Sequence, residues 1–538
     1  MSPDGRFLAF TSDRDGKPRI WLQQMDVGRE TPLTEGPDSA PRFSPDGNHV
    51  LFTRAQTGGS ALFRVSMLGG EVRRVADDAS DGDWSPDGGR VAFVRSRYDG
   101  IRSHPVLVVA RVEGGGEREL ARLSDRPQRG RGAEQRVRWS PDGQRIAVSG
   151  FVQHPGTPQH LLLVPLDGSG ATSVPAPGRV GLLSAVAWEG PDSVLYSQSL
   201  SVSGNSAGSL ARIVRQRLHD GAYSTLLWTP ESSFVVGNWP GRGIVYDARS
   251  SRQNLREVTL GSGASRPLSQ GTSTDRQPWL SPDGKKVVFT SNRGGGSLDV
   301  WIVDRASGLS ERLTDHPDED YDPALTPDGR YLLWSSNRSG PFEVWMADAH
   351  GGNPRQVTRD GVDAENPTAT ADGQWIIYAS GAAGRAGVWR IRPDGSEARR
   401  LVPDAILPEV SPDGRHVLFV ANRHPGLAIV GVAAVADGTV LPFEIRIEVR
   451  KQSQTLLGRA RWMSDGRAIA FVGQDASGAT GVFAQAFALA GDTSPTRTPL
   501  AGFDPDRLTE SFDIDADRVI LAESDQRSDV MAAIGLPR

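Results

Sequence analysis

Short apolar runs rich in Val, Phe and Leu recur along the whole chain, and each follows a polar turn motif. Clear examples are residues 6–12 (RFLAFTS), 49–53 (HVLFT), 286–291 (KVVFTS) and 416–420 (HVLFV). Runs of this length and composition predict strands that are covered on both faces by neighbouring elements. The hydrophobic pattern therefore predicts a chain of short, buried strands.

The turn motif is SPDG, and its spacing is that of a structural repeat. It occurs at residues 2–5, 44–47, 85–88, 140–143, 281–284 and 411–414. The variants TPDG (326–329), TADG (370–373) and MSDG (463–466) extend the series, and degenerate copies lie near Pro191, Pro240 and Ala516. Twelve copies result, 41 to 55 residues apart. Proline, aspartate and glycine each favour chain reversal, so every copy predicts a hairpin.

A second periodicity indicates that whole units repeat, and not isolated turns. An aromatic residue lies 18 or 19 positions after the turn proline in six copies: Trp21, Phe63, Trp301, Trp345, Trp389 and Phe483. A further strand-like stretch follows, as at residues 31–34 (TPLT), 311–314 (ERLT) and 355–358 (RQVT). Four strands in a period of 41 to 55 residues predict one blade of a β-propeller.

Composition agrees with an all-β fold. Glycine (62) and proline (37) are abundant, aromatic residues make up 7%, and 538 residues suffice for two large domains. A ring of twelve blades would exceed the usual four to eight, so we expect two consecutive six-bladed β-propellers of four-stranded antiparallel blades. The inner strand that should precede Ser2 is missing, which favours a start inside a longer protein. Residues 266–269 (RPLS) are predicted to close the second ring beside the strand-like stretches 511–514, 518–522 and 529–534.

The combined pattern resembles the TolB-type, WD40-like propeller repeat. Its middle part, S-x-R, stands at residues 12–14 (SDR), 291–293 (SNR) and 336–338 (SNR). The resemblance implies one propeller over residues 1–265, with an incomplete first blade, and a second over residues 266–538. The chain also resembles the extracytoplasmic sensor halves of bacterial receptor Ser/Thr kinases and of winged-helix regulators. That likeness implies a periplasmic or extracytoplasmic location and a sensor role.

Charge and hydropathy exclude several partners. A net charge of −5 and an isoelectric point near 6.0 give no field that attracts nucleic acid. The longest apolar stretch, residues 427–436, is too short to span a membrane, and residues 1–10 lack the pattern of a signal peptide. With no cysteine, disulfides and thiolate metal sites are excluded. We expect a monomer without cofactor or metal.

Three aspartates share one position in the repeat. Asp38, Asp275 and Asp320 each lie six residues before the Ser or Thr of a turn. A fixed offset would place such side chains near one rim of a ring, where they could bind a ligand. The same residues could instead hydrogen-bond to adjacent backbone, and the sequence leaves both interpretations open.

Other segments carry weaker chemical signals. Residues 204–208 (GNSAG) match the G-x-S-x-G nucleophile pattern at Ser206, in a Ser/Gly-rich context that favours a loop. The acidic run 315–322 (DHPDEDYD), which contains His316, could bind a hard cation or be a solvated loop. The Arg-rich residues 122–138 could form a partner-binding loop.

We therefore predict a non-enzymatic scaffold or sensor that binds a protein partner or a small ligand. The alternative is a propeller enzyme or accessory domain, either associated with a peptidase or acting as a channel-site polysaccharide lyase.

Overall fold

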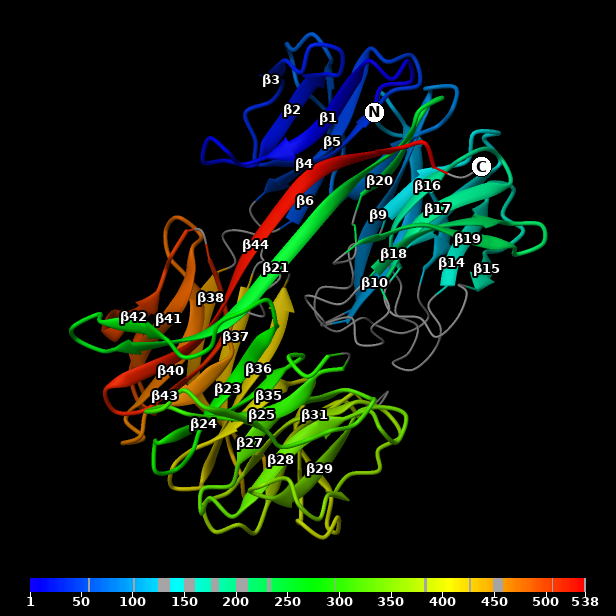
Figure 1. Ribbon diagram of the computed structural model, residues 1–538. Coiled ribbons are helices and arrows are strands. Elements are labelled where there is room, and N and C mark those ends of the chain that lie inside the picture. Colours follow the sequence, from blue (N-terminus) through cyan, green and yellow to red (C-terminus); the bar gives the residue numbers. More distant parts are fainter. Residues whose placement is uncertain are drawn as a thin grey trace. The chain divides into compact units, whose positions relative to one another are not determined.

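The protein is built almost entirely from β-strands (Figure 1). The computed structural model describes residues 1–56, 59–99, 102–123, 136–149, 160–175, 183–199, 211–229, 233, 235–295, 297–381, 385–424, 427–448, 458–505 and 507–536. Within these ranges the one helix is a single 3-10 turn, Ser494–Thr496. The predicted all-β class is confirmed.

The chain forms two compact units. The first comprises Met1–Asn205, Ser209–Ser250 and Arg527–Arg538, and the second comprises mainly Ser251–Gln526. This division differs from the predicted boundary between residues 265 and 266. The reason lies in two long strands, β21 (Gly243–Thr259) and β44 (Arg518–Ile534), each of which contributes residues to both units.

The first unit consists of antiparallel sheets whose strands are paired in chain order. One described sheet has three strands: β1 (Phe7–Ser12), β2 (Arg19–Gln24) and β3 (Glu30–Pro32). The others with consecutive strands have four: β4 (Asp38–Phe43), β5 (His49–Gln56), β6 (Gly59–Ser66) and β7 (Arg73–Ala76); β8 (Ser80–Trp84), β9 (Arg90–Asp99), β10 (Arg102–Arg111) and β11 (Arg118–Arg122); β12 (Arg136–Trp139), β13 (Arg145–Ser149), β14 (His160–Pro165) and β15 (Thr172–Pro175); β16 (Leu183–Trp188), β17 (Ser193–Ser199), β18 (Ala211–Arg217) and β19 (Tyr223–Thr229).

The second unit repeats this plan in five four-stranded sheets of the described chain. They are β23 (Asp275–Leu280), β24 (Lys286–Ser291), β25 (Asp299–Asp304) and β26 (Ser310–Arg312); β27 (Asp320–Leu325), β28 (Tyr331–Ser336), β29 (Glu343–Asp348) and β30 (Arg355–Gln356); β31 (Ala364–Ala369), β32 (Ile376–Ser380), β33 (Gly387–Ile391) and β34 (Arg399–Pro403); β35 (Ile406–Val410), β36 (His416–His424), β37 (Leu427–Ala434) and β38 (Val440–Glu448); β39 (Ala460–Trp462), β40 (Ala468–Gln474), β41 (Thr480–Ala486) and β42 (Thr498–Gly502). In each four-stranded sheet we call the first strand the inner strand.

The remaining sheet contains β21 and β44 as neighbours (Figure 1). β20 (Val236–Trp239) pairs with the beginning of β21, and β22 (Ser265–Pro267) pairs with its end. β43 (Leu508–Ile514) pairs with the beginning of β44. The stretch 266–269, which is predicted to close the second ring, thus overlaps β22. This strand belongs to the same sheet as β43 and β44, which contain the last copy of the repeat. The expectation of separate strands at residues 518–522 and 529–534 was wrong, because β44 runs through both.

The SPDG turns explain why the first residue of the motif is Ser or Thr. Ser281 Oγ donates a hydrogen bond to Asp283 Oδ1 (2.6 Å) and accepts one from the Lys286 backbone N–H (2.9 Å). Gly284 follows with a φ of +67°, which favours glycine. The same Ser–Asp bond recurs at Ser2, Ser44, Ser85, Ser140 and Ser411, and Thr replaces Ser at Thr326 and Thr370.

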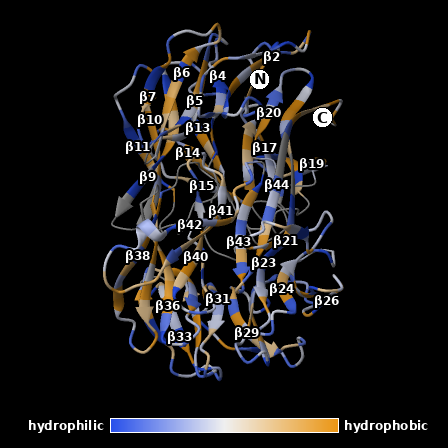
Figure 2. Cartoon of the chain, turned by 90° about the vertical axis from the view of Figure 1, so that its left-hand side faces the viewer, coloured by the Kyte–Doolittle hydropathy of each residue, from blue (hydrophilic) through white to orange (hydrophobic). Residues whose placement is uncertain are grey.

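The core lies between successive sheets. One position of the strand that follows the turn carries a large aromatic side chain with no solvent exposure, as at Phe52, Phe93, Phe289, Trp334 and Phe471. Figure 2 shows apolar residues concentrated along the strands. Burial of one such side chain stabilises the fold by about 1.5–3 kcal/mol. In these five sheets the aromatic side chain therefore contributes to the core between neighbouring sheets.

Candidate binding site on the inner strands of the second unit

Four consecutive inner strands of the second unit carry a bulge at the same place. Gln277, Asp322, Asn366 and Leu407 have φ values of +51° to +55°, and each precedes a proline. The strand register shifts at each of these places. A non-glycine residue in the left-handed region costs about 1–3 kcal/mol, and such residues cluster at functional sites. Bulges also redirect side chains.

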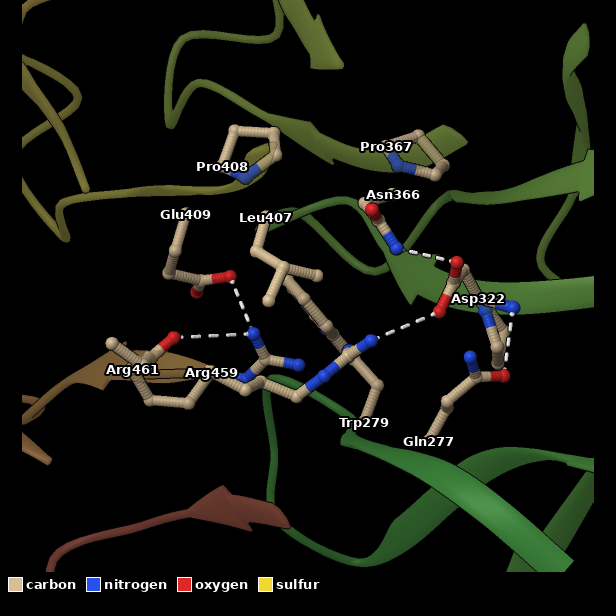
Figure 3. A pocket seen from close by; sticks show the side chains of 12 residues that line it. Gln277, Trp279, Asp322, Asn366, Pro367, Leu407, Pro408, Glu409, Arg459 and Arg461 are labelled. Atoms are coloured by element: carbon tan, nitrogen blue, oxygen red, sulfur yellow. Dashed lines mark hydrogen bonds and ion pairs between the residues drawn. The ribbon is translucent and has the colours of Figure 1, made fainter. Parts of the chain in front are cut away.

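The four bulged residues line one pocket (Figure 3). The space within and above it, open solvent included, is about 370 Å³. The other lining residues are the three following prolines Pro323, Pro367 and Pro408, together with Trp279, Glu409, Arg459, Ala460 and Arg461. The pocket thus combines amides, two carboxylates and two guanidinium groups with an apolar wall.

A chain of hydrogen bonds joins neighbouring inner strands along the pocket wall. The Gln277 backbone N–H donates to Ser511 Oγ (3.0 Å), and Gln277 Oε1 accepts from the Asp322 backbone N–H (3.1 Å). The side-chain amide of Asn366 in turn donates to the Asp322 carboxylate. Arg459 Nη2 lies 3.3 Å from the other oxygen of Asp322. These bonds fix the orientation of the polar side chains.

A second polar group lies beside Trp279. Arg461 Nη1 donates to Glu409 Oε2 at 2.9 Å, and its Nε lies 3.3 Å from Asp513 Oδ1. The guanidinium carbon stands 4.7 Å from the centre of the Trp279 ring, a cation–π contact. Burial raises the pKa of Glu409 to about 7, although Arg461 acts in the opposite direction. Burial also raises the pKa of Asp322 and of Asp513, against the effect of the arginines.

Next to Asn366, Glu365 accepts a hydrogen bond of 2.5 Å from the Tyr321 hydroxyl. Burial, and then the negative charge of Asp363, raise the pKa of Glu365 to about 8. Burial raises the pKa of Asp363 itself to about 6. Burial thus raises the pKa values of both neighbouring carboxyl groups towards the neutral range.

The three aspartates singled out by the sequence lie elsewhere, at the start of their inner strands. Asp275 and Asp320 are fully buried, and Asp38 is 1% exposed. Each carboxylate pairs with an arginine of its own sheet: Arg54 at 2.6 Å, Arg293 at 2.6 Å and Arg338 at 2.5 Å, respectively. The structure does not bring the three together, since Asp38 belongs to the first unit and the other two to separate sheets of the second.

The other segments singled out by the sequence lie partly outside the described residues. Residues 204–208 lie outside the described residues, as do residues 124–135 of the Arg-rich segment. In the acidic run, Glu319 accepts a hydrogen bond from the Leu298 backbone N–H (3.0 Å), and Asp322 lines the pocket. Among the described residues, no group of three or more His, Asp or Glu is placed to hold a metal ion. No helix in the described part is long and apolar enough to cross a membrane.

Sequence reasoning missed the pocket, although a signal was present. A proline stands three residues before the Ser or Thr of the turn at Pro41, Pro278, Pro323, Pro367 and Pro408. Proline is unusual in a central strand and marks a bulge. The residue before each of these prolines is the bulged one, and in the second unit its side chain lines the pocket.

Comparison with known proteins places this architecture in a family. The family model described as TolB beta propeller domain matches residues 1–191 and 244–440, more than half of the chain. An uncharacterized protein of Agrobacterium fabrum, Atu1656, is 36% identical over 157 residues, which is 27% of this chain and 52% of that protein. Tricorn protease homolog 1 of Streptomyces coelicolor is 25% identical over 321 residues, which is 56% of this chain and 23% of that protein.

This chain thus spans about half of the Agrobacterium relative and about a quarter of the Streptomyces relative. Among solved structures, TolB from Acinetobacter baumannii is 18% identical, with 68% of this chain and 82% of that chain covered and a TM-score of 0.29. With a family model matched over most of its length and repeated four-stranded antiparallel sheets, the chain belongs to the TolB beta propeller domain family.

Proposed function

We propose that this chain is a non-enzymatic scaffold of two six-bladed propellers that binds a small polar ligand in the inner-strand pocket of its second unit. The polarity of three of the four bulged residues supports the proposal. Ala40, which precedes Pro41 in the first unit, adopts the same left-handed backbone (φ +54°) with a methyl side chain. The bulge itself therefore does not require the polar side chains of Gln277, Asp322 or Asn366. Recognition of a ligand would explain why polar residues occupy these positions.

The chemistry of the pocket favours binding over catalysis. Asp322 and Glu409 form ion pairs with Arg459 and Arg461, respectively. Carboxylates held in this way are suited to orienting hydrogen-bond donors. A pre-organised polar wall beside an indole ring fits a small ligand with several hydrogen-bonding groups. The resemblance to extracytoplasmic sensors supports a sensor role for such binding, in the periplasm.

The proposal can be tested with a backbone-neutral substitution. Glycine accepts a positive φ, so Asn366→Gly removes the side-chain amide from the pocket without straining the bulge. We expect a thermal-shift screen with a library of polar metabolites to identify a ligand that stabilises the protein. We expect Asn366→Gly to weaken that ligand's binding about tenfold, the loss of roughly one hydrogen bond of about 1.4 kcal/mol.

Asn353→Gly is the matched control, because the φ of Asn353 (+54°) is within 1° of that of Asn366 and Asn353 is exposed in a bend outside the pocket. Equal binding by wild type and Asn366→Gly, with a ligand that does stabilise the protein, would place the binding site elsewhere.

A peptidase-associated role is the second candidate function. It is favoured by the similarity over 321 residues to a protein named as a tricorn protease homolog. In that case the chain would act as the accessory propeller of a proteolytic assembly. Hydrolysis of casein-derived peptides by the purified chain, or by a complex isolated with it, would distinguish this role from ligand binding alone.

A further inference from the structure

A second pocket lies in the sheet that contains β21 and β44. All its lining residues belong to the second unit, and none of them lines the pocket on the inner strands. The volume that is open to water-sized molecules is about 520 Å³. Small-molecule sites usually have volumes of about 300–1,000 Å³. The walls come from β21, from residues 265–271 and from β44, and Arg507 lies beside them.

Strand alternation explains the polar wall on β21. Arg252, Asn254 and Arg256 are separated by one residue each, and successive side chains of a strand point to opposite faces. All three residues line the pocket. On the opposite face, Leu255 is buried in an apolar cluster of the core. One strand thus serves the core with one face and the pocket with the other.

Residues 268–271 form the wall beside β21. The backbone N–H groups of Leu268 and Ser269 donate to the Leu255 carbonyl oxygen (2.8 and 3.1 Å), and Ser269 Oγ accepts a hydrogen bond from the Leu255 N–H (2.9 Å). Gln270 and Gly271 follow as exposed residues at the pocket. Within the described ranges, the side-chain amide of Gln270 makes no hydrogen bond. This amide is therefore available to a ligand.

The pocket carries more positive than negative charge. Four arginines line it, against the two carboxylates of Glu523 and Asp525. Arg256 Nε and Arg507 Nη1 share a single oxygen of Glu523, Oε2, at 3.0 and 3.2 Å. Arg507 Nε also lies 3.5 Å from Asp504 Oδ2. A cation is therefore disfavoured in this pocket, and an anion is favoured.

Two of the lining side chains are not engaged by the protein. Arg252 is exposed, and its guanidinium makes no ion pair or hydrogen bond in the described part of the chain. Asn254 Oδ1 is buried, and no described group donates to it. Arg266, by contrast, binds Glu257 through two hydrogen bonds of 3.1 Å. Buried polar atoms in folded proteins nearly always have a hydrogen-bond partner. Arg252 and Asn254 thus mark the part of the pocket that can receive a ligand.

We propose that this pocket binds a small anion, whose carboxylate or phosphate group is held by Arg252 beside Arg256 and whose hydrogen-bond donors reach Asn254. The planar fork of a guanidinium matches the geometry of both kinds of anionic group. The site is additional to the inner-strand pocket and does not depend on the function proposed for that pocket.

The test titrates the full chain with citrate and with pyrophosphate at low ionic strength, followed by isothermal titration calorimetry. We expect saturable binding of at least one probe at a single site, and the probe that binds more tightly distinguishes a carboxylate site from a phosphate site. Arg252→Gln should weaken that binding about tenfold, which corresponds to about 1.4 kcal/mol. Because Arg252 is exposed and its guanidinium has no partner in the described part of the chain, the fold does not depend on it.

Arg359→Gln is the matched control, because Arg359 is an exposed arginine of the same unit that lies outside both pockets, with a guanidinium that has no partner among the described residues. It should bind both probes like wild type, and so should Asn366→Gly. Failure of both probes to bind would overturn the proposal. Equal affinities of wild type and Arg252→Gln, or equal losses in Arg252→Gln and Arg359→Gln, would do the same. A loss in Asn366→Gly alone would place the anion in the inner-strand pocket instead.

Discussion

Replacing Asp320 with alanine is expected to lower the free energy of unfolding of the second unit by about 3–5 kcal/mol, the usual effect of removing one partner of a buried ion pair. Asp320 is fully buried, its Oδ2 lies 2.5 Å from Arg338 Nη2, and its Oδ1 accepts a hydrogen bond from Trp334 Nε1 (3.1 Å). The substitution leaves a largely buried guanidinium without its carboxylate. Urea unfolding followed by tryptophan fluorescence would measure the loss.

Two further variants test the cause of that loss. Asp320→Ala combined with Arg338→Met should be less destabilised than Asp320→Ala alone, since the unpaired charge is then removed as well. Asp315→Ala is the control, because the Asp315 side chain is 80% exposed in the same acidic run. A small effect of Asp320→Ala, equal to that of Asp315→Ala, would contradict a structural role and revive the ligand-binding interpretation of this aspartate.

Stability is expected to fall as the pH rises from about 5 to 8, in part because of Glu365. Its pKa in the folded chain is about 8, above the ordinary value of 4.5, as a result of burial and of Asp363. Between these values the folded state holds a proton that the unfolded state releases. The stabilising contribution of Glu365 is therefore fully present below pH 4.5 and is lost as the pH rises to about 8, by at most about 1.4 kcal/mol per pH unit.

Glu365→Gln should remove this contribution and flatten the profile, with the largest gain in stability relative to wild type above pH 8. The groups that face Glu365 and share in the titration are Tyr321, Asp363, Asp322 and Arg459. Glu397→Gln, at a side chain that is 61% exposed, serves as the control. Urea midpoints measured at one-unit steps from pH 5 to 9 give the slopes. Equal slopes for wild type and Glu365→Gln would show that Glu365 is ionised throughout this range.

Local chemistry made the sheets predictable from the sequence. The turn depends on four adjacent residues, and the distance from the turn proline to the aromatic residue gives the length of one repeat. Both features can therefore be predicted from the sequence without knowledge of tertiary contacts. The path of the last strand could not be read in this way. Residues 525–528 (DQRS) are polar and resemble a turn, yet β44 continues through them beside β21, a pairing that joins residues far apart in the chain.

The candidate pocket was predictable only in part. Its bulges follow from prolines at a fixed distance from the turn, a pattern visible in the sequence. Arg459 and Arg461 line the pocket because β39 lies near β35. The Arg461 guanidinium also stacks on the ring of Trp279, which belongs to β23. No spacing rule connects residues 279 and 461. The offset of Asp38, Asp275 and Asp320, by contrast, marks the ion pair that recurs in three sheets.

The two strands that serve both units have a consequence for how the chain is made. During synthesis the first unit can assemble most of its sheets early, but the strand that follows β21 in its sheet comes from residues after 526. During synthesis on the ribosome, the edge of β21 that pairs with β44 therefore stays unpaired until the whole second unit has emerged. A gene cut near residue 265 would yield two fragments that each lack strands, and a premature stop late in the gene would damage both halves of the protein.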